Sequence, residues 1–91
     1  MIAVVFEAEL SRQQADDLAH LMDDARPTRP AGVELATLLY EEGTARLIAY
    51  WRDEETLNRY LAETAVPRGQ ELMRQVGAEP TMRIVEVLDF G

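Results

Sequence analysis

The residues best suited to chemistry in this sequence are three aromatic side chains. Trp51 is the only tryptophan and stands just before Asp53-Glu54-Glu55, a strong signal for the start of a helix. Tyr60 falls within that predicted helix, and Phe6 falls within an alternating apolar run near the amino terminus. An indole can stack on a planar substrate, and a phenol can hydrogen-bond to its edge. Trp51, Tyr60 and Phe6 are therefore the candidate substrate-binding residues, and packing in a core is the alternative role for the first two.

The other polar candidates are the single histidine and several arginines. His20 suits acid–base catalysis, but it lies about 200° around its predicted helix from the apolar Leu18, which places it in solvent. Arg46, Arg52 and Arg83 would bind an anionic substrate if they reached a pocket, whereas pairing with the abundant carboxylates is the simpler expectation. No general base is identified, so the catalytic residues stay unassigned.

The composition argues against several classes of site and partner. There is no cysteine and only one histidine, which disfavours a disulfide framework and a transition-metal site. There is also no Ser/His/Asp set and no phosphate-binding glycine loop. The net charge of −8 disfavours nucleic acids and anionic membranes as partners. We expect one domain over residues 1–91, cytoplasmic, with no signal peptide and no membrane span.

The elements that position these residues follow from hydrophobic periodicity and capping patterns. Ser11 with Gln14 predicts a helix start, and Pro27 ends that helix. Glu42-Gly43 predicts a tight turn with two or three loop residues, and this choice decides which face Tyr40 occupies. The predicted elements are a strand over 2–10, a helix from 11 to about 26, strands over 33–40 and 44–52, a helix from 53, a helical piece over 67–77 and a strand over 81–90.

This order predicts an α+β fold of the ferredoxin-like βαββαβ type, with both helical regions on one face of a four-stranded antiparallel sheet. Leu47 and Trp51 would face the helices beside Phe6, and small alanine neighbours would allow either tight packing or an open slot. The opposite face would expose apolar residues such as Val5 and Ile48. We therefore expect a homodimer in which a second copy covers that face.

The sequence resembles the antibiotic biosynthesis monooxygenase family of dimeric α/β barrels. Pro30-Ala31-Gly32-Val33 is similar to the family's Pro-Gly-Phe entry to the second strand. The stretch from Ile48 to Glu55 is similar to its junction of strand, Trp, any residue, Ser or Asp, any residue and Glu. Leu38-Leu39-Tyr40 and the run from Ile84 to Leu88 also fit, so the likeness covers nearly the whole chain.

The resemblance implies a homodimer with a pocket between sheet and helices in each subunit. Several family members oxygenate aromatic polyketides or quinols with dioxygen and use no metal, flavin or haem, while others degrade haem. Chemistry without a cofactor needs an apolar, water-poor pocket and polar groups that stabilise a substrate anion.

The known catalytic residues of the family do not carry over to this chain. The haem-degrading branch has asparagine, tryptophan and histidine where this chain has Phe6, Tyr60 and Gln70. The aromatic-oxidising branch has asparagine and tyrosine where this chain has Leu47 and Leu57. Haem degradation is therefore not expected, and the polar part of the oxidising site is missing.

The sequence thus predicts a cofactor-independent, monooxygenase-like protein acting on a small aromatic, polyketide or quinone-type metabolite. The alternative is a non-catalytic dimeric module of the same fold that binds a small hydrophobic ligand or only assembles. A lyase, isomerase or cyclase would need a general base that the sequence does not reveal.

Overall fold

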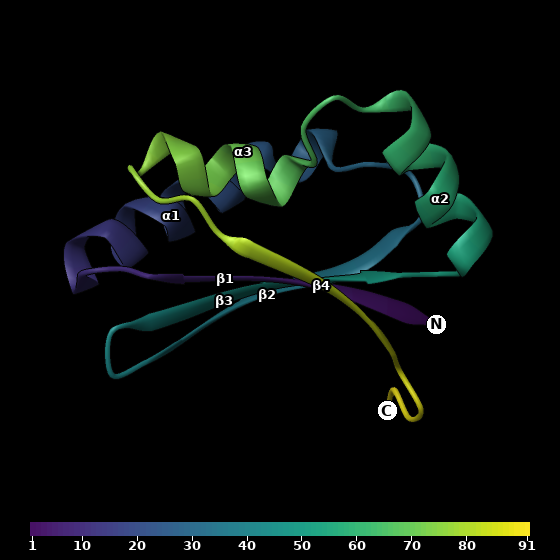
Figure 1. Ribbon diagram of the computed structural model, residues 1–91, viewed down its shortest axis with the longest axis horizontal. Helices are drawn as coiled ribbons and strands as arrows, with labels where there is room; N and C mark the ends of the chain where they lie inside the picture. Colours follow the sequence, from purple (N-terminus) through teal and green to yellow (C-terminus); the bar gives the residue numbers. More distant parts are fainter.

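The computed structural model describes residues 1–91 and contains one four-stranded sheet with its α-helices on one face (Figure 1). The elements are β1 (Ile2–Glu9), α1 (Arg12–Ala25), the short 3-10 helix η1 (Arg26–Thr28), β2 (Val33–Glu41), β3 (Thr44–Trp51), α2 (Glu54–Glu63), α3 (Arg68–Gln75) and β4 (Thr81–Glu86). This order confirms the predicted α+β, ferredoxin-like fold. No helix is long and apolar enough to cross a membrane.

The strands are antiparallel in the order β2-β3-β1-β4, which places β1 and β3 in the middle of the sheet. Phe6 of β1 pairs with Leu47 of β3, and Trp51 pairs with Ile2 on one side and Val33 on the other. Because side chains alternate along a strand, all five of these residues point toward the helices. Phe6, Leu47 and Trp51 are buried in the hydrophobic core, as predicted.

The first two long helices begin at the predicted caps. The Ser11 hydroxyl accepts a hydrogen bond from the backbone N–H of Gln14, whose side chain accepts one from the backbone N–H of Ser11. Asp53 accepts a hydrogen bond of 2.7 Å from the backbone N–H of Thr56 at the start of α2. The prediction for α3 is wrong by one residue. Pro67 is the N-cap rather than the first helical residue, because its ψ of 145° is extended.

The hairpin between β2 and β3 has the two-residue loop, which settles the alternative left open by the sequence. Glu41 pairs with Thr44, and the intervening Glu42 and Gly43 have φ values of 50° and 86°. Two residues with positive φ define the turn that matches the right-handed twist of paired strands. Tyr40 therefore lies on the helix-facing side, opposite Ala45.

The last strand ends earlier than predicted. The sequence pattern extends to Phe90, but β4 stops at Glu86, which pairs with Ile2 at the first position of β1. Beyond this point β1 offers only Met1, whose carbonyl accepts a hydrogen bond from Val87. The alternating pattern continues past the end of its partner strand, so pairing ceases there and the tail turns below the sheet (Figure 1).

The sheet face opposite the helices is partly covered within one chain. Phe90 in the tail packs against Tyr50 of β3, with ring centroids 5.4 Å apart. Leu39 in the edge strand β2 remains 51% exposed. Val85 in the opposite edge strand is also exposed. The expected second copy on this face stays a prediction.

Candidate ligand-binding site

A cavity of about 260 Å³ lies between the helix-facing side of the sheet and the helices. An engineered apolar cavity of about 150 Å³ binds benzene, so this cavity is large enough for one or two fused aromatic rings. Of its 21 lining residues, 15 are hydrophobic. The small side chains of Ala36 and Ala49 form part of its sheet wall. Of the two outcomes that the sequence allowed, a filled core and an open slot, the structure has the slot.

All three candidate residues line this cavity. Trp51 comes from the end of β3, Phe6 from the middle of β1 and Tyr60 from α2. Leu57 and Leu61 of α2 line it with them, as expected from their helical spacing. Trp51 belongs both to the core cluster and to the cavity wall. The structure thus brings the candidates together, while their role in binding a ligand stays a prediction.

Trp51 and Tyr60 form an aromatic corner of the cavity. Their ring centroids are 5.0 Å apart, and the ring planes are tilted by 40°. The tyrosine hydroxyl accepts a hydrogen bond of 2.9 Å from the backbone N–H of Arg68 at the start of α3. This bond uses only the hydroxyl oxygen, and the hydroxyl donates no hydrogen bond to another group of the chain. Tyr60 therefore has a free O–H donor for a ligand oxygen.

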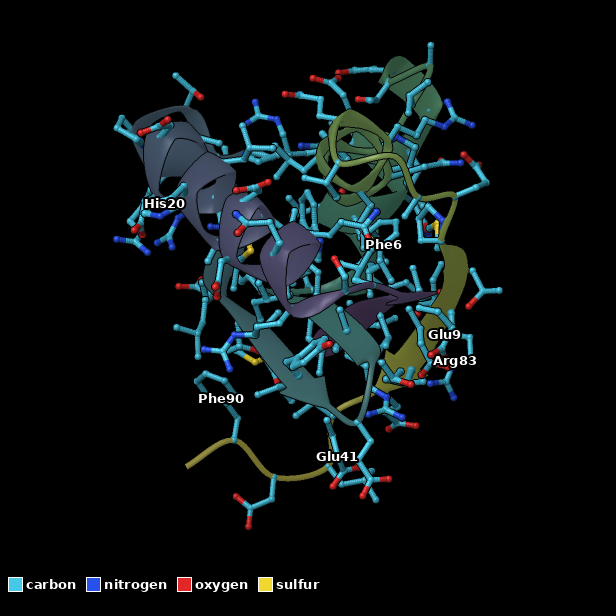
Figure 2. The ribbon with its side chains drawn as sticks, turned by 90° about the vertical axis from the view of Figure 1, so that its left-hand side faces the viewer. Phe6, Glu9, His20, Glu41, Arg83 and Phe90 are labelled. Carbon is cyan, nitrogen blue, oxygen red and sulfur yellow. The ribbon has the colours of Figure 1, made fainter.

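Phe6 is held in place by the close approach of α3 (Figure 2). Gly69, the second residue of α3, is buried against the Phe6 ring, and a Cβ at this position would overlap the ring carbons. Only glycine lets the helix approach so closely. Phe6 and Gly69 both line the cavity, so this contact forms part of its wall.

Trp51 has a comparable neighbour in Gly32, just before β2. Gly32 has a φ of 101°, a conformation that L side chains rarely adopt. A Cβ there would also overlap Thr56 of α2 and lie 3.3 Å from the indole. The Pro30–Val33 motif therefore places a backbone without side chain against the tryptophan, which explains the glycine of the motif in physical terms.

Three arginines that the sequence did not single out reach the cavity. Arg26 lies in η1, Arg29 follows it, and Arg68 begins α3. Arg26 and Arg29 are exposed and Arg68 is half-buried, so these residues stand at the opening of the cavity. For Arg29, the sequence alone indicates that no local ion pair forms. It has no acidic residue three or four positions away on either side, which is the spacing of an ion pair within a helix.

The arginines that the sequence did single out are paired with carboxylates. Arg46 lies 2.8 Å from Glu7, and Arg83 lies 3.8 Å from the same carboxylate on the sheet face opposite the helices. Arg52 lies 3.5 Å from Asp53. None of the three lines the cavity, so the simpler expectation for them is confirmed.

The single histidine and Tyr40, whose face the turn decided, are also outside the cavity. His20 is exposed on the outer side of α1 (Figure 2), as its position around the helix predicted. The hydroxyl of Tyr40 donates a hydrogen bond of 2.9 Å to the carbonyl of Leu10. No group of three or more His, Cys, Asp or Glu side chains is placed to hold a metal ion.

Hydrogen bonds to two carboxylates stabilise the ends of α2, which carries Tyr60, and α3, which begins at Arg68. The backbone N–H of Thr56 lowers the pKa of Asp53 at the start of α2. At the end of α3, hydrogen bonds from Arg74 and Gln70 lower the pKa of Glu79 from 4.5 to about 2. Both carboxylates are charged at neutral pH, and each ties a helix to its neighbouring segment.

The chemistry available in the cavity is limited by its lining. Its polar side-chain groups are the Tyr60 hydroxyl, the Trp51 indole N–H and the three guanidinium groups, and no carboxylate or imidazole lines it. These groups donate hydrogen bonds and positive charge but cannot accept a proton at neutral pH. The cavity can therefore hold an apolar ring and stabilise negative charge on its edge.

Comparison with known proteins identifies the fold. No protein-family model matches the sequence, and a search of curated proteins gives no match. The structure resembles a monooxygenase from the gene ActVA-Orf6 of Streptomyces coelicolor, solved in complex with the ligand nanaomycin D. The TM-score is 0.70 and the sequence identity 14%, with 98% of this chain and 88% of that chain covered.

Two further solved structures resemble the chain to a similar degree. SnoaB, a cofactor-independent oxygenase from Streptomyces nogalater, matches with a TM-score of 0.63 and 15% identity, over 98% of this chain and 94% of that chain. NE2512 from Nitrosomonas europaea, a protein of unknown function, matches with a TM-score of 0.67 and 20% identity, over 99% and 91%. The chain therefore has the fold of the antibiotic biosynthesis monooxygenases, as its sequence motifs predicted.

Proposed function

We propose that the cavity binds a small planar aromatic or quinone-type metabolite and that the protein promotes its oxygenation by dioxygen without a cofactor. The observation that carries this proposal is the largely apolar cavity in which the Tyr60 ring packs against the Trp51 indole and the Tyr60 hydroxyl donates no hydrogen bond within the chain. The similarity in fold to cofactor-independent oxygenases favours oxygenation over other reactions.

The residues of the cavity suit the formation of a substrate anion. An anthrone that loses a proton can react with dioxygen, and its CH₂ group with O₂ then gives a carbonyl group and water. As negative charge grows on the substrate oxygen, the Tyr60 hydroxyl would stabilise it by a hydrogen bond. Trp51 and Phe6 would hold the ring and exclude water. Because no carboxylate or imidazole lines the cavity, the substrate ionises by its own acidity, and the rate should rise with pH as it does so.

Oxygen uptake with a panel of anthrones and hydroquinones tests the proposal. We expect turnover by the wild-type protein and a loss of about 100-fold in kcat for Tyr60→Phe, because one anion-stabilising donor is removed. Tyr40→Phe is the matched control, since the Tyr40 hydroxyl is bonded to a backbone carbonyl outside the cavity. No turnover of any member of the panel by the wild-type protein would overturn oxygenation.

A second candidate function is a non-catalytic module that binds a small hydrophobic ligand. It is favoured by the absence of a proton acceptor from the cavity and by the apolar residues Leu47 and Leu57, which replace polar residues of the aromatic-oxidising enzymes. Saturable binding of an anthrone without oxygen uptake would support this function. The lyase, isomerase and cyclase alternatives need a general base, and the cavity does not supply one.

We also propose that residues 1–91 form one domain that assembles as a homodimer through the sheet face opposite the helices. Leu39, Val85 and Phe90 are 51%, 39% and 48% exposed on this side. A second copy of the same face would remove this apolar surface from water. The similarity in fold to the antibiotic biosynthesis monooxygenases supports this arrangement.

A further inference from the structure

The opening of the cavity carries positive charge in a chain that is strongly acidic. Arg26, Arg29 and Arg68 all line the cavity, although the sequence has 17 acidic residues against nine arginines. The three come from two segments, the turn after α1 and the start of α3, which lie about forty positions apart in the sequence. The fold therefore gathers them at one place.

Two of these arginines differ from every other arginine of the chain. Seven of the nine lie within 4.0 Å of a carboxylate. Arg26 is among those seven, because it lies 2.7 Å from Asp23. Only Arg29 and Arg68 have no carboxylate partner, and both line the cavity. In a chain with an excess of acidic residues, two guanidinium groups without a carboxylate partner give this opening a local positive charge, which favours a bound anion.

Arg68 is held in a fixed position at this opening. Its guanidinium donates to the carbonyl of Thr28 at 3.1 Å and to the hydroxyl of the same residue at 3.4 Å. A guanidinium has five N–H donors, so Arg68 keeps three for a ligand. Arg29 makes one long contact of 3.5 Å, to the carbonyl of Glu34. Arg68 is thus oriented by the protein, and Arg29 is exposed with a single long hydrogen bond.

We propose that the cavity selects an aromatic acid, with the ring inside and its carboxylate at the opening against Arg68 and Arg29. This inference rests on the proposed function and narrows its substrate class. The walls formed by Trp51 and Phe6 suit a planar ring, and the planar fork of an arginine matches the two oxygens of a carboxylate. No acidic side chain lines the cavity to oppose the ligand's charge.

Calorimetric titration with a matched pair of probes tests the proposal. We expect 2-naphthoate to bind about 10-fold more tightly than its neutral methyl ester, because hydrogen bonds to a charged group are stronger than neutral ones. Arg68→Gln should abolish this preference while the ester binds as before. Arg29→Gln should reduce the preference, and because Arg29 is exposed this variant should fold normally. Raising the salt concentration should weaken the binding of 2-naphthoate and leave the binding of its ester unchanged.

The control variant is Arg59→Gln, which removes one arginine that is paired with Glu55 and does not line the cavity. It should bind both probes as the wild type does. Equal affinity for acid and ester in the wild type would overturn the anion site and leave the aromatic cavity intact. If neither probe binds, both the anion site and the proposed function are overturned. If 2-naphthyl phosphate binds more tightly than 2-naphthoate and this binding depends on Arg68, the carboxylate proposal is overturned and the ligand class is an aromatic phosphate ester.

Discussion

Gly69→Ala tests the contact between α3 and Phe6 that bounds the cavity. The new methyl group would overlap the ring carbons of Phe6, which is buried and 3% exposed. Overpacking of a buried site costs about 1–3 kcal/mol. A glycine replaced by alanine in a helix gains about 0.5–1 kcal/mol when the methyl meets open space. The midpoints of these ranges, about 2 and about 0.75 kcal/mol, leave a net loss of about 1 kcal/mol in the free energy of unfolding.

Thermal unfolding gives this difference a measurable form. For a domain of this size, 1 kcal/mol shifts Tm by about 4–8 °C, so we expect Gly69→Ala to unfold about 4–8 °C below the wild type. Because Phe6 and Gly69 both line the cavity, any shift of the ring or of α3 that relieves the overlap changes the shape of the cavity. Gly69→Ala should therefore bind an aromatic ligand much more weakly than the wild type, even if its loss of stability is small.

The double variant Gly69→Ala with Phe6→Leu identifies the cause. A smaller side chain at position 6 leaves room for the methyl group, so the two changes together should destabilise the protein less than the sum of each alone. An increase in Tm for Gly69→Ala by itself would refute the reasoning, since it would mean that the position faces open space. Strict additivity in the double variant would refute it as well.

Three further predictions concern the cavity wall, acid stability and assembly. Tyr60→Phe should lower the free energy of unfolding by about 0.5–1.5 kcal/mol in urea titration, because the backbone N–H of Arg68 loses its acceptor. Glu79→Gln should be less stable than the wild type above pH 4.5, and the difference should vanish as the pH falls toward 2, because Arg74 lowers the pKa of Glu79 from 4.5 to about 2 and protonation then removes the charge that this pairing stabilises. Leu39→Glu should convert the proposed dimer into a monomer in sedimentation experiments, because a charge would be buried at the interface.

Each of these predictions has its own control. An unchanged free energy of unfolding for Tyr60→Phe would contradict the role of its hydroxyl as the acceptor for Arg68, and Tyr40→Phe, which removes a hydrogen bond outside the cavity, should leave ligand binding unchanged. A constant stability difference between wild type and Glu79→Gln from pH 7 to 2 would contradict the assigned pairing. His20→Glu adds the same charge as Leu39→Glu on an exposed helix surface and should not affect assembly. A wild-type protein that sediments as a monomer would contradict the dimer itself.

Local signals in the sequence predicted most of the elements correctly. The capping box at Ser11 and the N-cap at Asp53 depend on residues three positions away, so they can be read without knowing the fold. The register of Trp51 was also predictable, since it follows from alternation along one strand. The two-residue turn at Glu42-Gly43 was one of two possibilities, and only the pairing of Glu41 with Thr44 distinguished them.

The features that the sequence did not reveal depend on distant parts of the chain. The end of β4 is set by the start of β1, where Ile2 is the last partner available. The pairing of an arginine depends on which carboxylates the fold brings near it. Arg68 has Glu71 three positions away, which is a suitable spacing for an ion pair, yet its guanidinium bonds to Thr28 instead. The end of a strand and the partner of an arginine are thus determined by tertiary packing, and neither produces a periodic pattern in the sequence.

Fluorescence of the single tryptophan is the most direct test of the central claim, which is that the space beside Trp51 receives an aromatic ligand. Because the chain has one tryptophan, 3% exposed, the signal reports on this cavity alone. We predict that 1,4-naphthoquinone quenches the emission with a saturable, stoichiometric curve, because it occupies a defined site beside the indole. Quenching by naphthoquinone that rises without saturation, as for a quencher that collides from solution, would contradict the account.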